Sequence, residues 1–394
     1  MVARSAHRPR DAGKRAPGGR FLVSVVSAYP PDRGRLSEFA SELLQRLVSS
    51  YPFRLELLTD SPSKDTDLIR IVPTWRPDRP LNILALWARI LGSKSRLVHL
   101  NVHMAVFGRG RLVNFLGLAT ALIARLSGKR VLVSLHNVPD AIDLTALGWR
   151  SGLLFRLGLR LAALLLLRSA HAVVVTMRSY VALLKRAYGA KRVHWIPHGA
   201  WFAERGGAWS WGKRSVLFLG YLGPYKAVEA LAEAVEEASR QGEVKLLVAG
   251  VPHPNFPEHG RQALARLRQR RAVAYLGWVR NEDLPELIGR VGVAVLPYRT
   301  STGTSGVLHL LSGLGVPFVA SDTPELRELK REGAGLLLTS LEPRSLASAI
   351  LRALEDRRLA EQLSSRSMAF ARARSWNVVA RAYARLYAGL LRPR

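Results

Sequence analysis

A stretch of small, hydroxyl-bearing residues follows an apolar run in the C-terminal third of the chain. Residues 291–296 predict a strand, and Gly303, Thr304, Ser305 and Gly306 lead into a helical pattern that starts near Ser305. At a helix N-terminus the backbone amides lack partners and the helix dipole favours an anion. Glycines allow close backbone approach, and hydroxyls add donors. The stretch therefore suits a diphosphate held without a metal. Its alternative is an ordinary turn capped by Ser305.

Two further residues have the chemistry that such a ligand requires. Lys226 follows the predicted strand 216–219 and a turn, and it is predicted to begin a helix. Because the dipole disfavours lysine there, its presence favours phosphate binding. His136 ends the predicted strand 131–135, where an imidazole can bind a substrate or stabilise developing charge. The alternative is a loop imidazole bonded to nearby backbone.

His103 and His198 also follow predicted strands and are open to the same two interpretations. Carboxylates are scarce at the predicted strand ends, and no spacing indicates a catalytic pair. Asp322 and Glu325 flank a predicted helix start, where capping is the commoner role. The sequence also lacks the phosphate-loop motif Gly-x-x-x-x-Gly-Lys-Ser/Thr, the Gly-x-Ser-x-Gly elbow and His-Glu-x-x-His. These absences argue against an NTPase, a serine hydrolase and a zinc protease.

Apolar strands alternate with amphipathic helices along the chain, which predicts parallel sheets covered on both faces. Strands are predicted at 21–28, 54–58, 69–72, 97–100, 131–135, 172–175, 193–196, 216–219, 244–249, 273–275, 291–296, 318–320 and 335–338. Helices are predicted near 36–49, 81–92, 111–127, 149–168, 179–188, 226–240, 259–270, 283–289, 305–314, 324–332 and 344–356. The fold class is therefore α/β, with two doubly wound, Rossmann-like domains facing each other across a cleft.

A glycine-containing break in this alternation divides the chain. We expect a disordered basic arm at 1–20, an N-terminal domain at 21–202, a linker at 203–213 and a C-terminal domain at 214–374. The arm has six Arg and Lys against one Asp and no apolar segment, so it is not expected to be a secretory signal.

The composition indicates a globular protein that seeks polyanions. The 394 residues carry a formal net charge of +30, and without cysteine they offer neither disulfides nor thiolate metal sites. The apolar run at 153–167 contains Arg156 and Arg160 and ends next to Arg168, a pattern typical of a helix in a membrane interface. The alternative is a core helix with arginines on its wet face. No run is long enough to predict a membrane-spanning helix.

The order of several motifs resembles the retaining glycosyltransferases of the GT-B fold, glycosyltransferase family four. The motifs are Ser-Ala-Tyr-Pro-Pro-Asp-Arg-Gly at 27–34, Ser-Leu-His-Asn at 134–137, Ile-Pro-His-Gly at 196–199, Leu-Phe-Leu-Gly-Tyr-Leu-Gly-Pro-Tyr-Lys at 217–226, and the region 294–322. The resemblance implies transfer of a sugar from a nucleotide-sugar with retention of anomeric configuration. It also implies that residues 375–394 form a helix that crosses back to the N-terminal domain.

The resemblance implies roles for individual residues. Lys226 would hold the donor diphosphate, residues 303–306 the distal phosphate, and Gly34 would let its loop approach the donor. His136 would act in catalysis near the sugar and the acceptor. Tyr221, Gly250, Gly277, Thr302 and Glu325 would lie near the donor nucleotide or sugar, and His103, Asn137 and His198 near the acceptor. No metal and no cofactor is expected, because backbone and lysine would neutralise the leaving group.

The chain departs from the family pattern at four positions. Thr302 and Leu310 stand where many members have a pair of glutamates, Tyr221 where an arginine is frequent, and Arg35 where a second glycine is frequent.

The sequence predicts a glycosyltransferase that is cytoplasmic, peripheral to an anionic membrane face, and acts on a lipid-linked or polysaccharide acceptor. The alternatives are a non-catalytic protein of this fold that binds a glycan or a partner glycosyltransferase, a related epimerase or phosphorylase of this fold, and, on charge alone, a nucleic-acid-binding protein. No helix-turn-helix, zinc-finger or aromatic RNA-binding signature supports the last.

Overall fold

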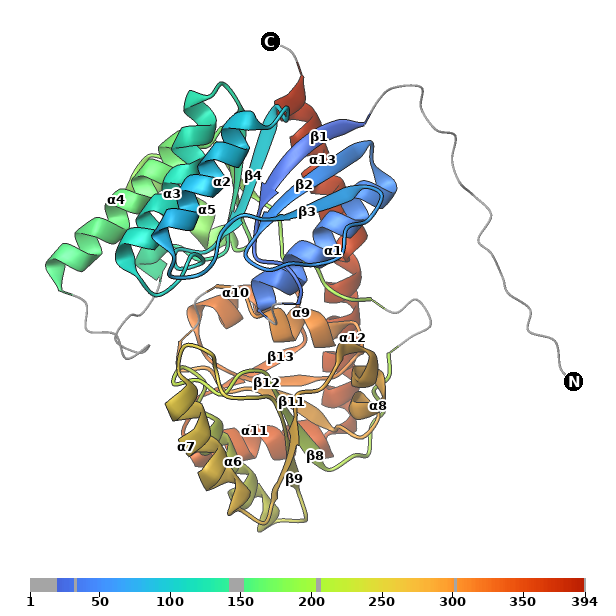
Figure 1. The fold of residues 1–394 in the computed structure, drawn as a ribbon. Helices are drawn as coiled ribbons and strands as arrows, with labels where there is room; N and C mark the ends of the chain where they lie inside the picture. The colour runs from blue at the N-terminus through green and yellow to red at the C-terminus, as the bar shows by residue number, and fades with distance from the viewer. Residues whose placement is uncertain (1–19, 32–33, 142–151, 203–206, 301–302, 393–394) are drawn as a thin grey trace, which may run out of the picture.

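The computed structural model describes residues 20–31, 34–141, 152–202, 207–300 and 303–392. Most of the predicted basic arm, the first part of the predicted linker and Thr302 lie outside the described residues. Within them the predicted fold class is confirmed, because the chain forms two α/β units, each built on a parallel sheet (Figure 1).

The N-terminal unit contains a described sheet of seven parallel strands in the order β3-β2-β1-β4-β5-β6-β7. The strands are β1 (Phe21–Val26), β2 (Phe53–Thr59), β3 (Ile69–Pro73), β4 (Leu97–Val102), β5 (Arg130–Leu135), β6 (Ala172–Val175) and β7 (Val193–Trp195). The central strands β4 and β5 are almost wholly buried on both faces, as expected when helices cover both sides.

The helices of this unit divide between the two faces of the sheet. They are α1 (Arg35–Ser50), α2 (Pro80–Gly92), α3 (Arg111–Leu126), the short 3₁₀ helix η1 (Pro139–Ala141), α4 (Leu153–Ser169) and α5 (Arg178–Tyr188). Helices α2, α3 and α4 lie side by side on one face, whereas α1 covers the other (Figure 1). Because each follows a parallel strand, the first turns of α2, α3 and α4 lie toward the carboxyl edge of the sheet.

The C-terminal unit has six described parallel strands in the order β10-β9-β8-β11-β12-β13. They are β8 (Ser215–Leu219), β9 (Lys245–Ala249), β10 (Val273–Gly277), β11 (Val293–Leu296), β12 (Phe318–Ser321) and β13 (Leu336–Thr339). The helices are α6 (Val228–Ser239), α7 (Pro257–Arg268), the 3₁₀ helix η2 (Asn281–Asp283), α8 (Leu284–Ile288), α9 (Gly306–Ser312), α10 (Pro324–Arg331), α11 (Pro343–Glu355), α12 (Arg357–Ala373) and α13 (Trp376–Leu391). Helix α12 was not among the helices predicted from the sequence.

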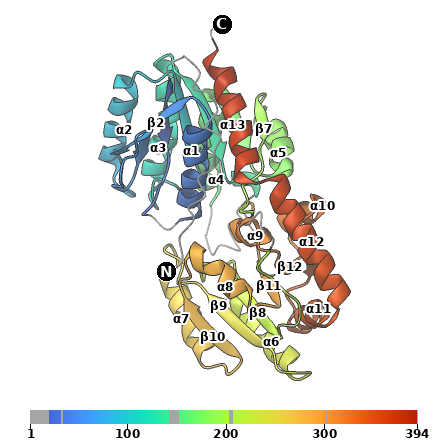
Figure 2. The ribbon, with the colours of Figure 1, turned by 90° about the vertical axis from the view of Figure 1, so that its right-hand side faces the viewer.

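Helix α13 returns to the N-terminal unit and packs against α1 (Figure 2). A chain of buried hydrogen bonds fixes it to the sheet. His99 on β4 contacts the Tyr387 hydroxyl at 2.7 Å through Nδ1 and the Ser134 hydroxyl at 2.8 Å through Nε2. Ser134 in turn contacts the Tyr383 hydroxyl at 2.7 Å. Two tyrosines of α13 are thereby tied to two neighbouring strands.

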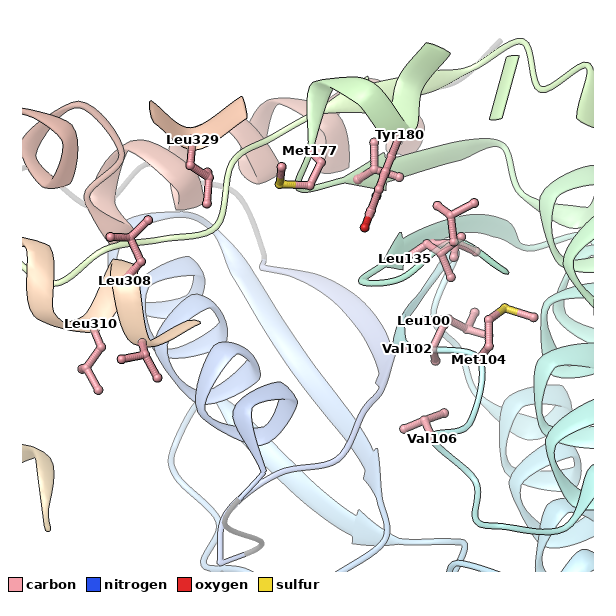
Figure 3. Packing of buried hydrophobic residues seen from close by; sticks show 14 of the residues in the cluster. Leu100, Val102, Met104, Val106, Leu135, Met177, Tyr180, Leu308, Leu310 and Leu329 are labelled. Carbon is pink, nitrogen blue, oxygen red and sulfur yellow. The ribbon is translucent and has the colours of Figure 1, made fainter. Parts of the chain in front are cut away.

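The polypeptide passes between the units twice, and the two passages run side by side. Ala200 donates its amide to the Arg374 carbonyl at 2.9 Å and forms a parallel bridge with Ser375. A β-carbon at Gly199 would overlap the Trp376 ring, so glycine is needed for this approach. Buried apolar residues of both units also belong to one cluster, in which Met177 lies near Leu329 (Figure 3). The units therefore share a hydrophobic core at their interface.

Candidate functional site

Lys226 lies at the carboxyl edge of the C-terminal sheet, but it does not begin a helix as predicted. Helix α6 starts two residues later, and Lys226 instead forms an antiparallel bridge with Tyr298. Its side chain is 8 % exposed, and the ammonium nitrogen lies 5.3 Å from the Tyr298 ring centre and 5.7 Å from that of Phe218. The bridge to a neighbouring strand, rather than a helix dipole, thus positions this cation, and the aromatic faces stabilise its charge.

Three glycines, of which Gly250 and Gly277 were predicted near the donor, meet at the same edge. Gly220, Gly250 and Gly277 follow β8 and β9 and end β10, and hydrogen bonds link them to neighbouring strand ends. The Gly250 amide donates to the Gly277 carbonyl at 2.7 Å, and a β-carbon at Gly250 would overlap the Gly220 carbonyl. Gly220 has a positive φ of 124°, and a β-carbon there would be 2.6 Å from the Lys226 ammonium. Glycine at position 220 therefore leaves room for the lysine, and glycine at position 250 lets the ends of β8 and β9 approach each other.

The predicted phosphate loop precedes α9. The Ser305 hydroxyl caps this helix, accepting a hydrogen bond from the Leu308 amide at 3.2 Å, and contacts the Tyr298 hydroxyl at 3.1 Å. The capping interpretation of Ser305 is therefore correct. Thr304 differs, because its buried hydroxyl has no hydrogen-bond partner among the described residues. A buried hydroxyl without a partner is costly, and a ligand oxygen would satisfy it.

The loop touches His136 from across the cleft. Gly303 has a φ of 151°, and a β-carbon there would be 2.5 Å from the His136 carbonyl oxygen. Two residues that the sequence singled out for different reasons, one from each unit, are therefore in contact. Through Tyr298 and Ser305 the same loop is linked to Lys226.

Hydrogen bonds fix the tautomer of His136. The Ser27 hydroxyl donates to the Ala28 carbonyl at 2.7 Å, so its oxygen accepts from the Asn101 amide nitrogen at 2.9 Å. The Asn101 oxygen then faces His136 Nε2 at 2.7 Å and can only accept a hydrogen bond, so Nε2 carries the proton and donates it to this bond. Nδ1 is left as the basic nitrogen. Burial, aided by the nearby His198, holds the pKa of His136 well below its usual range, so the ring is neutral near pH 7.

The three residues predicted near the acceptor have structural contacts of their own. His103 Nδ1 accepts from the Ala105 amide at 3.2 Å, and burial lowers its pKa to about 4. The Asn137 side-chain oxygen accepts from the Met104 amide at 3.0 Å and thereby shapes the loop after β4. His198 Nδ1 contacts the Gly199 carbonyl at 2.7 Å, and its ring lies 5.1 Å from that of Phe39. These contacts match the alternative interpretation of a loop imidazole for both histidines.

The remaining predicted residues surround this centre. The Tyr221 ring lies 5.3 Å from His253 and 5.9 Å from Trp278, so aromatic side chains gather beside the three strand ends. Gly34 precedes α1 in an extended conformation. Glu325 lies in the first turn of α10, where burial raises its pKa, while Thr323 caps that helix.

A cavity of about 180 Å³ opens between the units next to the phosphate loop. Glu38, Ser41 and Glu42 of α1 line it on one side, and Gly306 and Leu310 of α9 on the other. His198 also reaches it, but His136 and Lys226 are not part of its lining. Leu310 thus faces this cavity at a position where many members of the resembled family have a glutamate.

His309 was not among the site residues predicted from the sequence. It is buried one helical turn after Ser305, and its Nδ1 donates to the Ser305 carbonyl at 2.8 Å. Its Nε2 is buried without a partner among the described residues, and its ring centre lies 4.8 Å from that of His198. The only available signal was its place in the 305–309 segment, which does not distinguish a core histidine from a ligand. Within the described ranges, no group of three or more His, Asp or Glu residues could hold a metal ion.

Known proteins resemble this chain in sequence over one segment and in structure over most of its length. Residues 213–356 match the family model "Glycosyl transferases group 1", and no curated protein matches the sequence. Sucrose-phosphate synthase from Thermosynechococcus elongatus has a similar structure, with a TM-score of 0.72, 17% identity, and 94% of this chain and 99% of that chain covered.

Two further solved structures are similar over their whole lengths. Anabaena Alr3699/HepE, in complex with UDP and glucose, gives a TM-score of 0.69 at 16% identity, covering 94% of this chain and 100% of that one. WaaG, a glycosyltransferase involved in lipopolysaccharide biosynthesis, gives 0.67 at 12% identity, with 94% and 100% covered. At such identities the similarities show the shared GT-B fold. Together with the family match they indicate a glycosyltransferase.

Proposed function

We propose that this protein transfers a sugar from a nucleoside-diphosphate sugar to an acceptor hydroxyl, with retention of anomeric configuration. The observation that carries the proposal is the contact between Gly303 and His136 beside Lys226. A diphosphate that contacts Lys226 and the Gly303–Gly306 backbone would have its distal end beside His136. Retention rests on the family resemblance.

The chemistry of these groups suits departure of a nucleoside diphosphate. The Lys226 ammonium, held between aromatic rings, offers a fixed positive charge for the leaving phosphate. The unpartnered Thr304 hydroxyl can donate to a phosphate oxygen. His136 presents a neutral ring whose Nδ1 can accept a hydrogen bond from a sugar or acceptor hydroxyl. HepE, which shares the fold, has been solved with UDP and with UDP-glucose, which supports a nucleotide-sugar as donor.

The acceptor in this proposal is lipid-linked or a polysaccharide, and the protein works at the cytoplasmic face of a membrane. A second candidate is a non-catalytic protein that binds a glycan or a partner glycosyltransferase. It is favoured by Leu310, an apolar side chain in the cavity beside the phosphate loop. Neither candidate requires a metal or an organic cofactor.

A thermal-shift series with UDP-, GDP- and ADP-sugars tests the proposal. One nucleotide class is expected to raise the melting temperature, and Lys226→Met, which keeps the buried apolar stem, is expected to abolish the rise. Release of free sugar from the stabilising donor then separates the candidates, because a transferase hydrolyses some donor in the absence of acceptor. Stabilisation without any hydrolysis supports the non-catalytic protein, and no stabilisation by any donor contradicts a donor site.

A further inference from the structure

The largest group of exposed apolar side chains lies on the helix layer of the N-terminal unit. Of the fourteen large apolar side chains exposed in the described part of the chain, nine belong to α2, α3 and α4. Six of them lie near the N-terminal ends of these helices: Leu81, Leu84, Leu112, Phe115, Leu153 and Leu157. Leu153, Leu81 and Leu112 are 83 %, 79 % and 63 % exposed, so water surrounds most of each side chain. Such grouping indicates an interaction surface rather than chance exposure.

The charges on the same helices have one sign. Helices α2, α3 and α4 contain six arginines and no aspartate or glutamate: Arg89, Arg111, Arg125, Arg156, Arg160 and Arg168. By contrast, α6 of the C-terminal unit carries four glutamates over twelve residues. Arg89 pairs with Glu56 and Arg160 with Asp140, both outside the layer, while the Arg111 guanidinium lies 4.9 Å above the Phe155 ring between α3 and α4. Leucines interleaved with cations suit a surface that is apolar within and anionic at its boundary.

The position of this surface relates it to the cleft. The exposed first turns follow β3, β4 and the segment after β5, so they border the carboxyl edge of the sheet, where His136 lies. The loop before α3 contains His103 and reaches the other unit through Arg109, whose guanidinium donates to the Pro254 carbonyl at 3.1 Å. In Figure 1, α4 is the outermost helix of this layer. No described helix is both long enough and apolar enough to cross a bilayer.

We propose that the first turns of α2, α3 and α4 dock on an anionic lipid surface, with their leucines among the head groups and with Arg111 and Arg156, the two arginines in these first turns, paired with lipid phosphates. A second copy of the chain is a poorer occupant, because two such faces would bring arginines together without any carboxylate from these helices to neutralise them. The geometry would bring the mouth of the cleft close to the membrane. That consequence rests on the proposed function, whereas the docking itself does not.

Sedimentation of the full chain with vesicles tests the docking without any nucleotide or acceptor. Vesicles of equal phosphatidylglycerol and phosphatidylcholine are expected to bind the protein, pure phosphatidylcholine vesicles are not, and salt should weaken binding. Leu153→Ser combined with Leu157→Ser should lower the partition coefficient about tenfold or more. Arg156→Glu, which places a favourable negative charge at the start of α4, should lower it by about tenfold.

Matched variants on the other unit are the controls. Leu276→Ser and Arg358→Glu remove an exposed leucine and reverse an exposed arginine there, and they should leave the partition coefficient unchanged. An equal loss in these controls would assign the binding to net charge and overturn the proposal, as would no binding at low salt. A lipid-free dimer that the leucine variants dissociate would identify a second copy as the occupant and also overturn it. Failure of the donor-binding series with intact vesicle binding would contradict only the proposed function.

Discussion

The backbone of Gly303 rests against the carbonyl oxygen of His136, so that no β-carbon fits between them. This contact joins the phosphate loop of one unit to the carboxyl edge of the other. The two units can approach this closely at the site only because Gly303 has no side chain.

Replacing Gly303 by alanine should therefore separate the two units at the site. The residue has a φ of 151°, and the new β-carbon would be 2.5 Å from the His136 oxygen, so the loop must move. We expect turnover of the donor to fall about hundredfold, because small displacements of reacting groups are costly. Gly389→Ala, where a β-carbon meets nothing within 4 Å, should leave turnover unchanged. Normal turnover in Gly303→Ala would show that the loop does not take part.

Replacing Thr304 by valine should separate stability from ligand binding. Valine has the shape of threonine without the buried hydroxyl that lacks a partner, so the ligand-free protein should gain about 1 kcal/mol of unfolding free energy. If the hydroxyl donates to a donor phosphate, donor affinity should fall about tenfold in the same variant. Urea unfolding and calorimetric titration measure the two effects. Unchanged donor affinity would remove Thr304 from the site.

The buried ion pair between Glu332 and Arg374 should contribute strongly to stability. The Glu332 carboxylate lies 3.1 Å from Arg374 and 3.2 Å from Arg178, and both Glu332 and Arg374 are almost fully buried. Glu332→Gln would leave the Arg374 guanidinium buried without a counter-charge and should cost about 3 kcal/mol of unfolding free energy. Glu361→Gln breaks the exposed pair with Arg357 and should cost less than about 0.5 kcal/mol. Equal losses in the two variants would contradict the importance of burial.

Stability should also fall as the solution becomes mildly acidic. Burial lowers the pKa of His99 to about 3 from an ordinary value of 6.5. Between these two pH values the unfolded chain therefore binds a proton at His99 that the folded chain does not bind. This contribution to the unfolding free energy is fully present above pH 6.5 and is lost as the pH falls toward 3. Near pH 5 the loss amounts to about 2 kcal/mol. His103, His136 and His309 act in the same direction.

The share of His99 can be isolated by unfolding curves between pH 5 and 7. In His99→Asn the unfolding free energy should depend less steeply on pH, because up to one proton fewer is taken up on unfolding. Tyr387→Phe keeps His99 buried, so its unfolding free energy should show the same slope against pH as that of the unaltered protein. If His99→Asn has the same slope, His99 is not the group that titrates.

The sequence predicted the fold class because many of the buried parallel strands are short apolar runs, as in β6 and β11. It also indicated which residues follow strand ends, and Gly303 and His136 meet there. It did not predict the bridge that holds Lys226 to Tyr298, since such pairing depends on the register of distant strands. Contacts such as that between His99 and Tyr387 join residues 288 positions apart, and no local pattern reports them.

The return of α13 has a consequence for the order in which the protein can be completed during synthesis. Tyr383 and Tyr387 fill the face of the N-terminal sheet beside α1, yet the ribosome makes them after the whole C-terminal unit. The C-terminal sheet can therefore acquire all its strands first, while the face of the N-terminal sheet that α1 covers lacks the rest of its cover until α13 is made. The part of the chain that emerges early is thus the part that finishes folding late.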